Sequence, residues 1–199
     1  MVQMKRRMVL TAAAATTAWI LTGCGDKRLD DIEGMPLTGT KMGASFELTD
    51  PAGNTRTLAD FKGKVTLVFF GFTQCPDVCP TALLRAVEAK RLLGADGDRL
   101  QVVFITLDPE RDTPEVLDAY VTAFDPDFLG LYGSLEQTRK TADEFKVYYA
   151  KVPTGSSYTL DHTALSYVYD ADGALRLALR HTQSAEAFAS DIGKVMALG

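Results

Sequence analysis

Two cysteines and a histidine are the residues of this chain whose types and spacing could do chemistry. Cys75 and Cys79 lie four residues apart in the segment 71–80, directly after the apolar run 65–70. His162 is one of only two histidines. Two thiols at this spacing can close a disulfide, act as a redox pair or bind a soft metal ion. All three chemistries are open on spacing alone.

The prolines beside the cysteines predict where the thiols lie. Pro80 favours the first turn of a helix and biases Cys79 away from helical angles, so we expect a helix over residues 80–93 with Cys79 at or beside its cap. A thiolate there faces free amides and the positive end of the helix dipole, so its pKa is expected to fall. Cys75, which precedes Pro76, is expected in the loop before the helix.

The histidines are the candidates for a further ligand. His162 lies just before a predicted strand, near the place that thioredoxin-type oxidoreductases give to a cis proline. Two thiolates and one imidazole form a soft three-coordinate set, which favours Cu(I), whereas structural zinc normally takes four protein ligands. The alternatives are zinc with a water ligand, or a histidine satisfied by the backbone. His181 is interpreted as a surface residue.

Residues 153–157 are rich in Pro, Gly and Ser and are expected to form a loop. This suggests the hypothesis that His162 rides on a mobile arm and closes over metal that the cysteines hold. Amide exchange across residues 151–163 that copper leaves unchanged would count against it.

Charged residues near these positions are candidates for supporting roles. Asp108, Arg111 and Asp112 could support the ligands or face a partner, and a charged segment of this kind is also a good helix start. Asp161 is adjacent to His162 and is a candidate for orienting the imidazole, because carboxylates often do so for metal-bound histidines.

The elements around these residues predict an α/β domain. The runs 65–70 and 102–107 are near-continuously apolar and rich in β-branched and aromatic residues, as is typical of parallel strands covered on both faces. Besides the helix at 80–93, three helices are predicted from their N-caps, which are Thr113, Ser134 (with Gln137 in a capping box) and Ser184.

Two hairpins and one extra strand complete the pattern. The predicted strands are residues 46–49 with 55–58, residues 129–132, and residues 164–169 with 174–179. Their order along the chain is that of a thioredoxin-like fold with an N-terminal β-hairpin and an inserted strand-helix unit.

The front of the chain is typical of a bacterial lipoprotein. Three basic residues precede an uncharged stretch, and residues 21–24 place small side chains before a cysteine, as a lipobox does. We expect residues 1–23 to be a signal peptide and Cys24 to carry lipid; the alternative is an ordinary secretory signal. Residues 24–43 are predicted to be a flexible tether, and residues 44–199 the folded domain.

The net charge of the chain and the compartment expected for it limit the kinds of partner that it can have. Removing residues 1–23 takes away three basic residues and no acidic one, which moves the net charge from −5 to −8. An acidic domain without a basic cluster is a poor candidate for nucleic acid. An exported, membrane-anchored protein, on the periplasmic face of the inner membrane, depends on a local reductant to keep its thiols reduced.

Three segments resemble one known family. Residues 71–80, 106–113 and 158–163 are similar, in order, to motifs of the Sco (SenC) copper chaperones that serve cytochrome c oxidase, and the resemblance runs from about residue 46 to the C-terminus. It implies a thioredoxin-like fold, a copper ion held by Cys75, Cys79 and His162, and a client in the dinuclear copper site of oxidase subunit II. Many members use a transmembrane helix where this chain has the predicted lipid anchor.

The main expectation is therefore a tethered copper chaperone, not an enzyme, which takes copper from a periplasmic donor. The alternative is a thiol-disulfide oxidoreductase or redox sensor, in which one thiolate of the Cys75 and Cys79 pair attacks a client disulfide and the other resolves the mixed disulfide. A thiol peroxidase is disfavoured, because no Thr-x-x-Cys surrounds either thiol and neither has an adjacent arginine. Reduction of a client disulfide does not need His162, whereas the proposed copper site does. The role of His162 therefore distinguishes the copper chaperone from the oxidoreductase.

Overall fold

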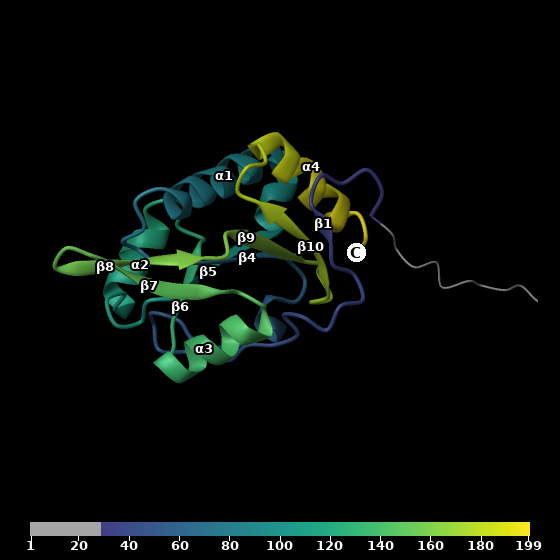
Figure 1. Ribbon diagram of the computed structural model, residues 1–199. Helices are drawn as coiled ribbons and strands as arrows, with labels where there is room; N and C mark the ends of the chain where they lie inside the picture. Colours follow the sequence, from purple (N-terminus) through teal and green to yellow (C-terminus); the bar gives the residue numbers. More distant parts are fainter. Residues whose placement is uncertain (1–28) are drawn as a thin grey trace, which may run out of the picture.

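Figure 1 shows a central sheet with helices on both faces; the computed structural model describes residues 29–199. In chain order, the strands are β1 (Met35–Pro36), β2 (Leu48–Thr49), β3 (Thr55–Arg56), β4 (Val65–Gly71), β5 (Leu100–Thr106), β6 (Leu129–Leu131), β7 (Tyr149–Thr154), β8 (Ser157–His162), β9 (Leu165–Tyr169) and β10 (Leu175–Arg180). The helices are α1 (Val78–Leu92), α2 (Pro114–Thr122), α3 (Leu135–Glu144) and α4 (Ala185–Met196), with the 3-10 helices η1 (Leu58–Phe61) and η2 (Gly94–Arg99).

The apolar run that predicted a buried strand is the middle of the sheet. Every residue of β4 is buried, and β4 pairs in parallel with β5 and antiparallel with β9. The strand order is β1-β10-β9-β4-β5-β6, and β6 is parallel to β5. A strand with a neighbour on each side and a helix layer over each face is buried on both faces, which explains the near-continuous apolar pattern, interrupted only by Thr66.

The predicted helix caps are confirmed. The side chains of Thr113, Ser134 and Ser184 accept hydrogen bonds from the backbone amides of α2, α3 and α4 respectively. Helices α1 and α4 pack together on one face of the sheet, and α3 lies on the other (Figure 1). Leu135, the first residue of α3, is 57% exposed.

The other predicted elements are confirmed with small shifts at their ends. Strands β2 and β3 form the short N-terminal hairpin, and β9 and β10 form the C-terminal one. The strand expected to end at residue 58 stops at Arg56, because η1 begins at Leu58. The inserted strand β6 and helix α3 are present as predicted. The architecture is a thioredoxin-like α/β fold.

The segment 153–157 is not a loop, as was predicted, but the turn of a two-stranded antiparallel sheet. Strands β7 and β8 pair along their whole length, from Tyr149 opposite His162 to Thr154 opposite Ser157. The two residues between the strands begin with Gly155, whose φ of 59° suits the first position of a tight hairpin turn. The Pro, Gly and Ser residues of this segment predicted a loop, but β7 continues through Pro153 to Thr154. We call β7 and β8 together the histidine hairpin.

The ordered domain begins before residue 44, so the prediction of a flexible tether over residues 24–43 is wrong for part of that range. Strand β1 pairs with β10, and the amide of Gly34 donates to the buried carboxylate of Asp191 at 2.8 Å. The hydroxyl of Tyr169 donates to the carbonyl of Gly43 at 2.7 Å. These long-range contacts bring residues 34–43 onto the domain.

The predicted signal peptide, residues 1–23, and the predicted lipidation site Cys24 lie outside the described residues. Within residues 29–199, no helix combines the length and apolar character needed to cross a membrane.

Candidate metal centre

The two thiols lie where β4 ends and α1 begins. The connecting residues 72–77, here called the cysteine loop, hold Cys75, whose side chain is half-buried, while Cys79 is 0% exposed. Both cysteines are free of disulfide bonds. Loops at the carboxyl ends of parallel strands are where α/β sheets commonly bind ligands, so the pair occupies a favourable place for chemistry.

Helix α1 starts at Val78, two residues earlier than predicted, and this reverses the roles of the two thiols. Cys79 lies within the first helical turn with its side chain turned into the core, and its amide donates to the sulfur of Cys75 at 3.4 Å. The side chain of Asp77, the N-cap, makes no capping hydrogen bond. Cys75 therefore faces the free amides of the helix start, the position expected for Cys79.

The pKa values follow this arrangement. A hydrogen bond from the Cys79 thiol, together with the amides of Asp77 and Cys79, lowers the pKa of Cys75 to about 3 against the opposing effect of burial. The hydrogen bond to Cys75, together with burial and the charge on Cys75, raises the pKa of Cys79. The expectation of a lowered pKa for Cys79 is thus corrected: Cys75 is the thiolate, and Cys79 holds the shared proton.

Gly71, the last residue of β4, makes room for the buried thiol. A Cβ at this position would lie 2.7 Å from the sulfur of Cys79 and 2.9 Å from Cε2 of Phe104. A Cβ atom is essentially never found within 3.0 Å of a heavy atom to which it is not bonded. Any side chain at position 71 would therefore push Cys79 away from the strand. The glycine is therefore required by the close approach of the sulfur to the backbone.

His162, the last residue of β8, brings the imidazole to the thiols. Its Nε2 lies 3.6 Å from the sulfur of Cys79, and its Nδ1 lies 3.0 Å from the carbonyl oxygen of Thr163. Because a carbonyl only accepts, Nδ1 carries the proton and Nε2 has a free lone pair. The rings of Phe69 and Phe72 meet the imidazole edge to face, with centroids 6.2 Å and 6.0 Å away.

The three side chains form a compact ligand set. One ligand atom from each of Cys75, Cys79 and His162 lies within 4.8 Å of the others, and the described residues hold no other such group of His, Cys, Asp or Glu. The set contains two soft sulfurs and one nitrogen, one ligand fewer than structural zinc normally takes from a protein. It opens to a cleft of about 300 Å³ that Asp77 and Asp161 also line.

A larger hollow of about 550 Å³ lies elsewhere, between α3 and residues 44–47. Its lining includes Glu47, Lys140 and Glu144 but no cysteine or histidine. The chemistry of the thiols and the imidazole therefore belongs to the smaller cleft.

The supporting roles predicted for acidic residues are only partly reproduced. Asp161 is exposed, and the Nδ1 of His162 contacts the Thr163 carbonyl, so the proposed orientation of the imidazole by Asp161 is wrong. Asp108 is buried and accepts a hydrogen bond from the hydroxyl of Tyr158, on the same strand as His162. It acts on the histidine hairpin rather than on the ligand itself. His181 is exposed, as predicted.

Some residues around the site were missed from the sequence. Thr73 binds Asp112 from the cysteine loop, and Tyr158 binds Asp108. Both lie inside the motifs that carried the family resemblance, but nothing in their spacing shows that they meet residues so far along the chain. Gly71 had a usable signal, since a glycine at the end of an apolar strand often marks a close backbone approach.

The fold and the site together define a class of protein: a thioredoxin-like domain with a candidate metal centre of two thiols and one imidazole. A family model described as SCO1/SenC matches residues 35–197, and the chain belongs to that family.

Individual relatives agree with this assignment. The chain is 43% identical over 136 residues to an SCO2-like protein of Rickettsia felis, covering 67% of this chain and 66% of that protein. It is 34% identical over 204 residues to the mitochondrial SCO2 homolog of Homo sapiens, covering 98% of this chain and 76% of that protein. The structure of ScoI from Bradyrhizobium japonicum with copper bound is similar with a TM-score of 0.71 and 42% identity, over 78% of this chain and 99% of that one.

The first prediction concerns the space at Gly71. We expect Gly71→Ala to lower the free energy of unfolding by about 1–3 kcal/mol, because the new methyl group overpacks against the sulfur of Cys79. The measurement is denaturant unfolding of the reduced protein. The matched control is Gly193→Ala in α4, where a Cβ would meet Leu93 at an ordinary 3.7 Å, and equal losses in the two variants would contradict the prediction.

The second prediction concerns the thiolate. Because the pKa of Cys75 is lowered, its thiolate persists as the pH falls, until the pH approaches about 3. In reduced, metal-free protein its alkylation rate should therefore be nearly constant from about pH 5 to about pH 8, whereas an ordinary thiol changes about tenfold per pH unit. Cys79→Ala removes the main hydrogen bond and should restore the ordinary slope. A wild-type rate that already rises tenfold per unit would overturn this assignment.

Proposed function

We propose that this protein is a copper metallochaperone that holds Cu(I) or Cu(II) through Cys75, Cys79 and His162. The observation that carries the proposal is the convergence of the two sulfurs and the Nε2 nitrogen within 4.8 Å of one another. Two sulfurs and an imidazole are ligands that copper accepts in both oxidation states. The similarity to a copper-bound ScoI structure supports the same cargo.

The cleft geometry suits transfer rather than storage. Cys79 is fully buried, but Cys75 and His162 are only partly covered and line the open cleft. A partner's ligand can therefore approach copper from the side of Cys75 and His162, and replace them one at a time. We propose that the receiving site is the dinuclear copper site of cytochrome c oxidase subunit II, the client that family membership implies. Mixing copper-loaded protein with the apo copper domain of subunit II tests this, and copper that stays with the chaperone would argue against this client.

Copper binding is the third prediction. Wild-type reduced protein should bind about one Cu(I) per chain, and Cys75→Ser should lose tight binding. His162→Ala should weaken binding by at least about tenfold, because even residues behind metal ligands typically contribute that much. The measurement is competition with a chromophoric Cu(I) chelator.

His181→Ala is the matched control for the ligand histidine. It removes the other histidine, which is exposed and directly follows β10, and should leave copper binding unchanged. If His162→Ala binds copper as tightly as wild type, the three-ligand site is wrong.

A specific observation also favours a second function, that of a thiol-disulfide oxidoreductase. Cys75 is a partly exposed thiolate with its pKa lowered to about 3, and the thiol of Cys79 lies beside it. The Cys75 thiolate would attack a client disulfide, forming a mixed disulfide and releasing one client thiolate; Cys79 would then resolve it, leaving a Cys75–Cys79 disulfide and a reduced client. Disulfide reductase activity that survives His162→Ala while copper binding is already weak in the wild type would favour this reading.

We further propose that the chain is exported and held at the periplasmic face of a membrane by lipid on Cys24. The support is the basic, apolar and small-residue pattern of residues 1–24. Two or more acyl chains would give stable anchoring. Mass spectrometry of the mature amino terminus tests the proposal, and an unmodified Cys24 would refute it.

A further inference from the structure

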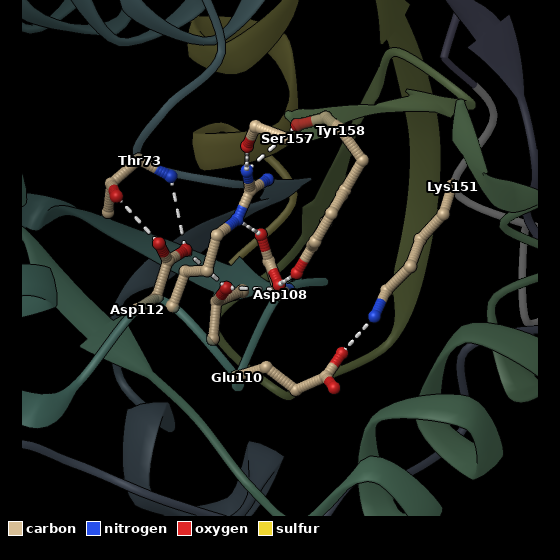
Figure 2. A network of polar contacts seen from close by, with 9 residues as sticks. Thr73, Asp108, Glu110, Asp112, Lys151, Ser157 and Tyr158 are labelled. Atoms are coloured by element: carbon tan, nitrogen blue, oxygen red, sulfur yellow. Dashed lines mark hydrogen bonds and ion pairs between the residues drawn. The ribbon is translucent and has the colours of Figure 1, made fainter. Parts of the chain in front are cut away.

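The loop between β5 and α2 connects the two parts of the chain that carry the proposed ligands. Residues 108–112, here called the bridging loop, meet the cysteine loop on one side and the histidine hairpin on the other, as Figure 2 shows. The cysteine loop and the histidine hairpin are more than seventy residues apart in sequence, yet both are tied to the same five residues.

Asp112 holds the cysteine loop. Its carboxylate accepts hydrogen bonds from the hydroxyl of Thr73 at 2.6 Å and from the amide of Thr73 at 3.1 Å. Thr73 lies two residues before Cys75, and the amide of Cys75 closes a turn onto the carbonyl of Phe72. The backbone that presents the half-buried sulfur of Cys75 is therefore fixed to a buried carboxylate.

Asp108 and Arg111 hold the histidine hairpin. The hydroxyl of Tyr158 donates to Asp108 at 2.8 Å, and Nη1 of Arg111 donates to the carbonyl of Tyr158 at 2.8 Å. The guanidinium also lies 3.7 Å from the centre of the Tyr158 ring and pairs with Asp108. Lys151 of β7 adds an ion pair to Glu110 at the surface.

These contacts control the face of β8 that carries the ligand. Tyr158, Leu160 and His162 alternate along the strand and so project to the same side. Tyr158 meets Asp108, Leu160 is buried in the core, and His162 meets Cys79. The histidine hairpin pairs with no strand of the main sheet, and a two-stranded sheet alone is only marginally stable, so its contacts with the body of the domain decide where His162 lies.

Asp112, which holds the cysteine loop, and Asp108, which holds the histidine hairpin, are linked to each other through Thr106. The hydroxyl of Thr106 donates to Asp112 at 2.5 Å and accepts from the amide of Asp108 at 2.9 Å. Both carboxylate residues are 1% exposed. A segment that only started α2 would leave its charges in water, and Thr113 already caps that helix with its own hydroxyl.

We infer that the bridging loop is one positioning element for the whole ligand set: Asp112 places the cysteines through Thr73, and Asp108 with Arg111 places His162 through Tyr158. This inference rests on the proposed copper site. It assigns the conspicuous charges of the 108–112 segment to the alignment of ligands, and it makes Tyr158 and Thr73 positioning residues that contact no metal.

The test is a double-mutant cycle on copper affinity. Tyr158→Phe removes the hydroxyl that binds Asp108 but keeps the ring that Arg111 covers, and should weaken copper binding about tenfold. In a His162→Ala background the same change should have no further effect, because it acts only through that ligand. Thr73→Val should weaken binding in both backgrounds, since it acts on the cysteines, and Thr73→Ser should restore it.

Hydrogen exchange of the protein without copper gives an independent readout. Tyr158→Phe should speed amide exchange over residues 157–162 and leave residues 73–79 unchanged, and Thr73→Val should do the reverse. Tyr148→Phe is the matched control, because Tyr148 is 68% exposed, and it should alter neither segment nor the copper affinity. Arg111→Lys serves as a second variant of the hairpin side if Tyr158→Phe does not fold.

The outcomes are distinct. Full copper affinity in Tyr158→Phe, or an equal loss of affinity with and without His162, would overturn the inference. Exchange that rises equally in both segments would also overturn it, because a general loss of stability would then explain the effect. Failure of the wild-type protein to bind copper would overturn the proposed function, and this inference with it.

Discussion

The packing of the first turn of α1 against the end of β4 is the contact on which the site depends. It places the sulfur of Cys79 in the core, where only a glycine at position 71 leaves space, and it directs the free amides of the helix toward Cys75. One thiol is thereby buried and protonated, and the other is a partly exposed thiolate. The different characters of two identical side chains come from this single packing arrangement.

The sequence was informative for most of the elements that depend on local pattern. The near-continuous apolar run of β4 and the hydroxyl caps of α2, α3 and α4 each involve residues close together in the chain, and they were found at or near their predicted positions. The thiols and His162 could be chosen as candidates because so few such residues exist in the chain.

The features that could not be predicted from the sequence depend on the exact start of a helix or on contacts between residues far apart in the chain. A shift of two residues in the start of α1 decided which sulfur faces the amides. Unlike the other three helices, α1 has no side-chain capping hydrogen bond that would mark its start. The contact between Tyr158 and Asp108 joins residues fifty apart, and the contact between Gly34 and Asp191 joins residues 157 apart. Such pairs depend on the tertiary fold, so the histidine hairpin and the early start of the domain appeared only in the structure.

The attachment of the N-terminal segment has a consequence for how the domain faces its surroundings. The carbonyl of Asp31 is bonded by Lys194, near the end of α4, and in Figure 1 the described chain begins at the opposite end of the molecule from the histidine hairpin. A domain pulled from that end would turn its cleft outward, away from whatever surface holds it. Any recipient would then be met roughly one domain diameter from that surface, about 40 Å for a domain of this size. The point at which the chain enters the fold, and not the ligands themselves, would therefore set the direction that the cleft faces.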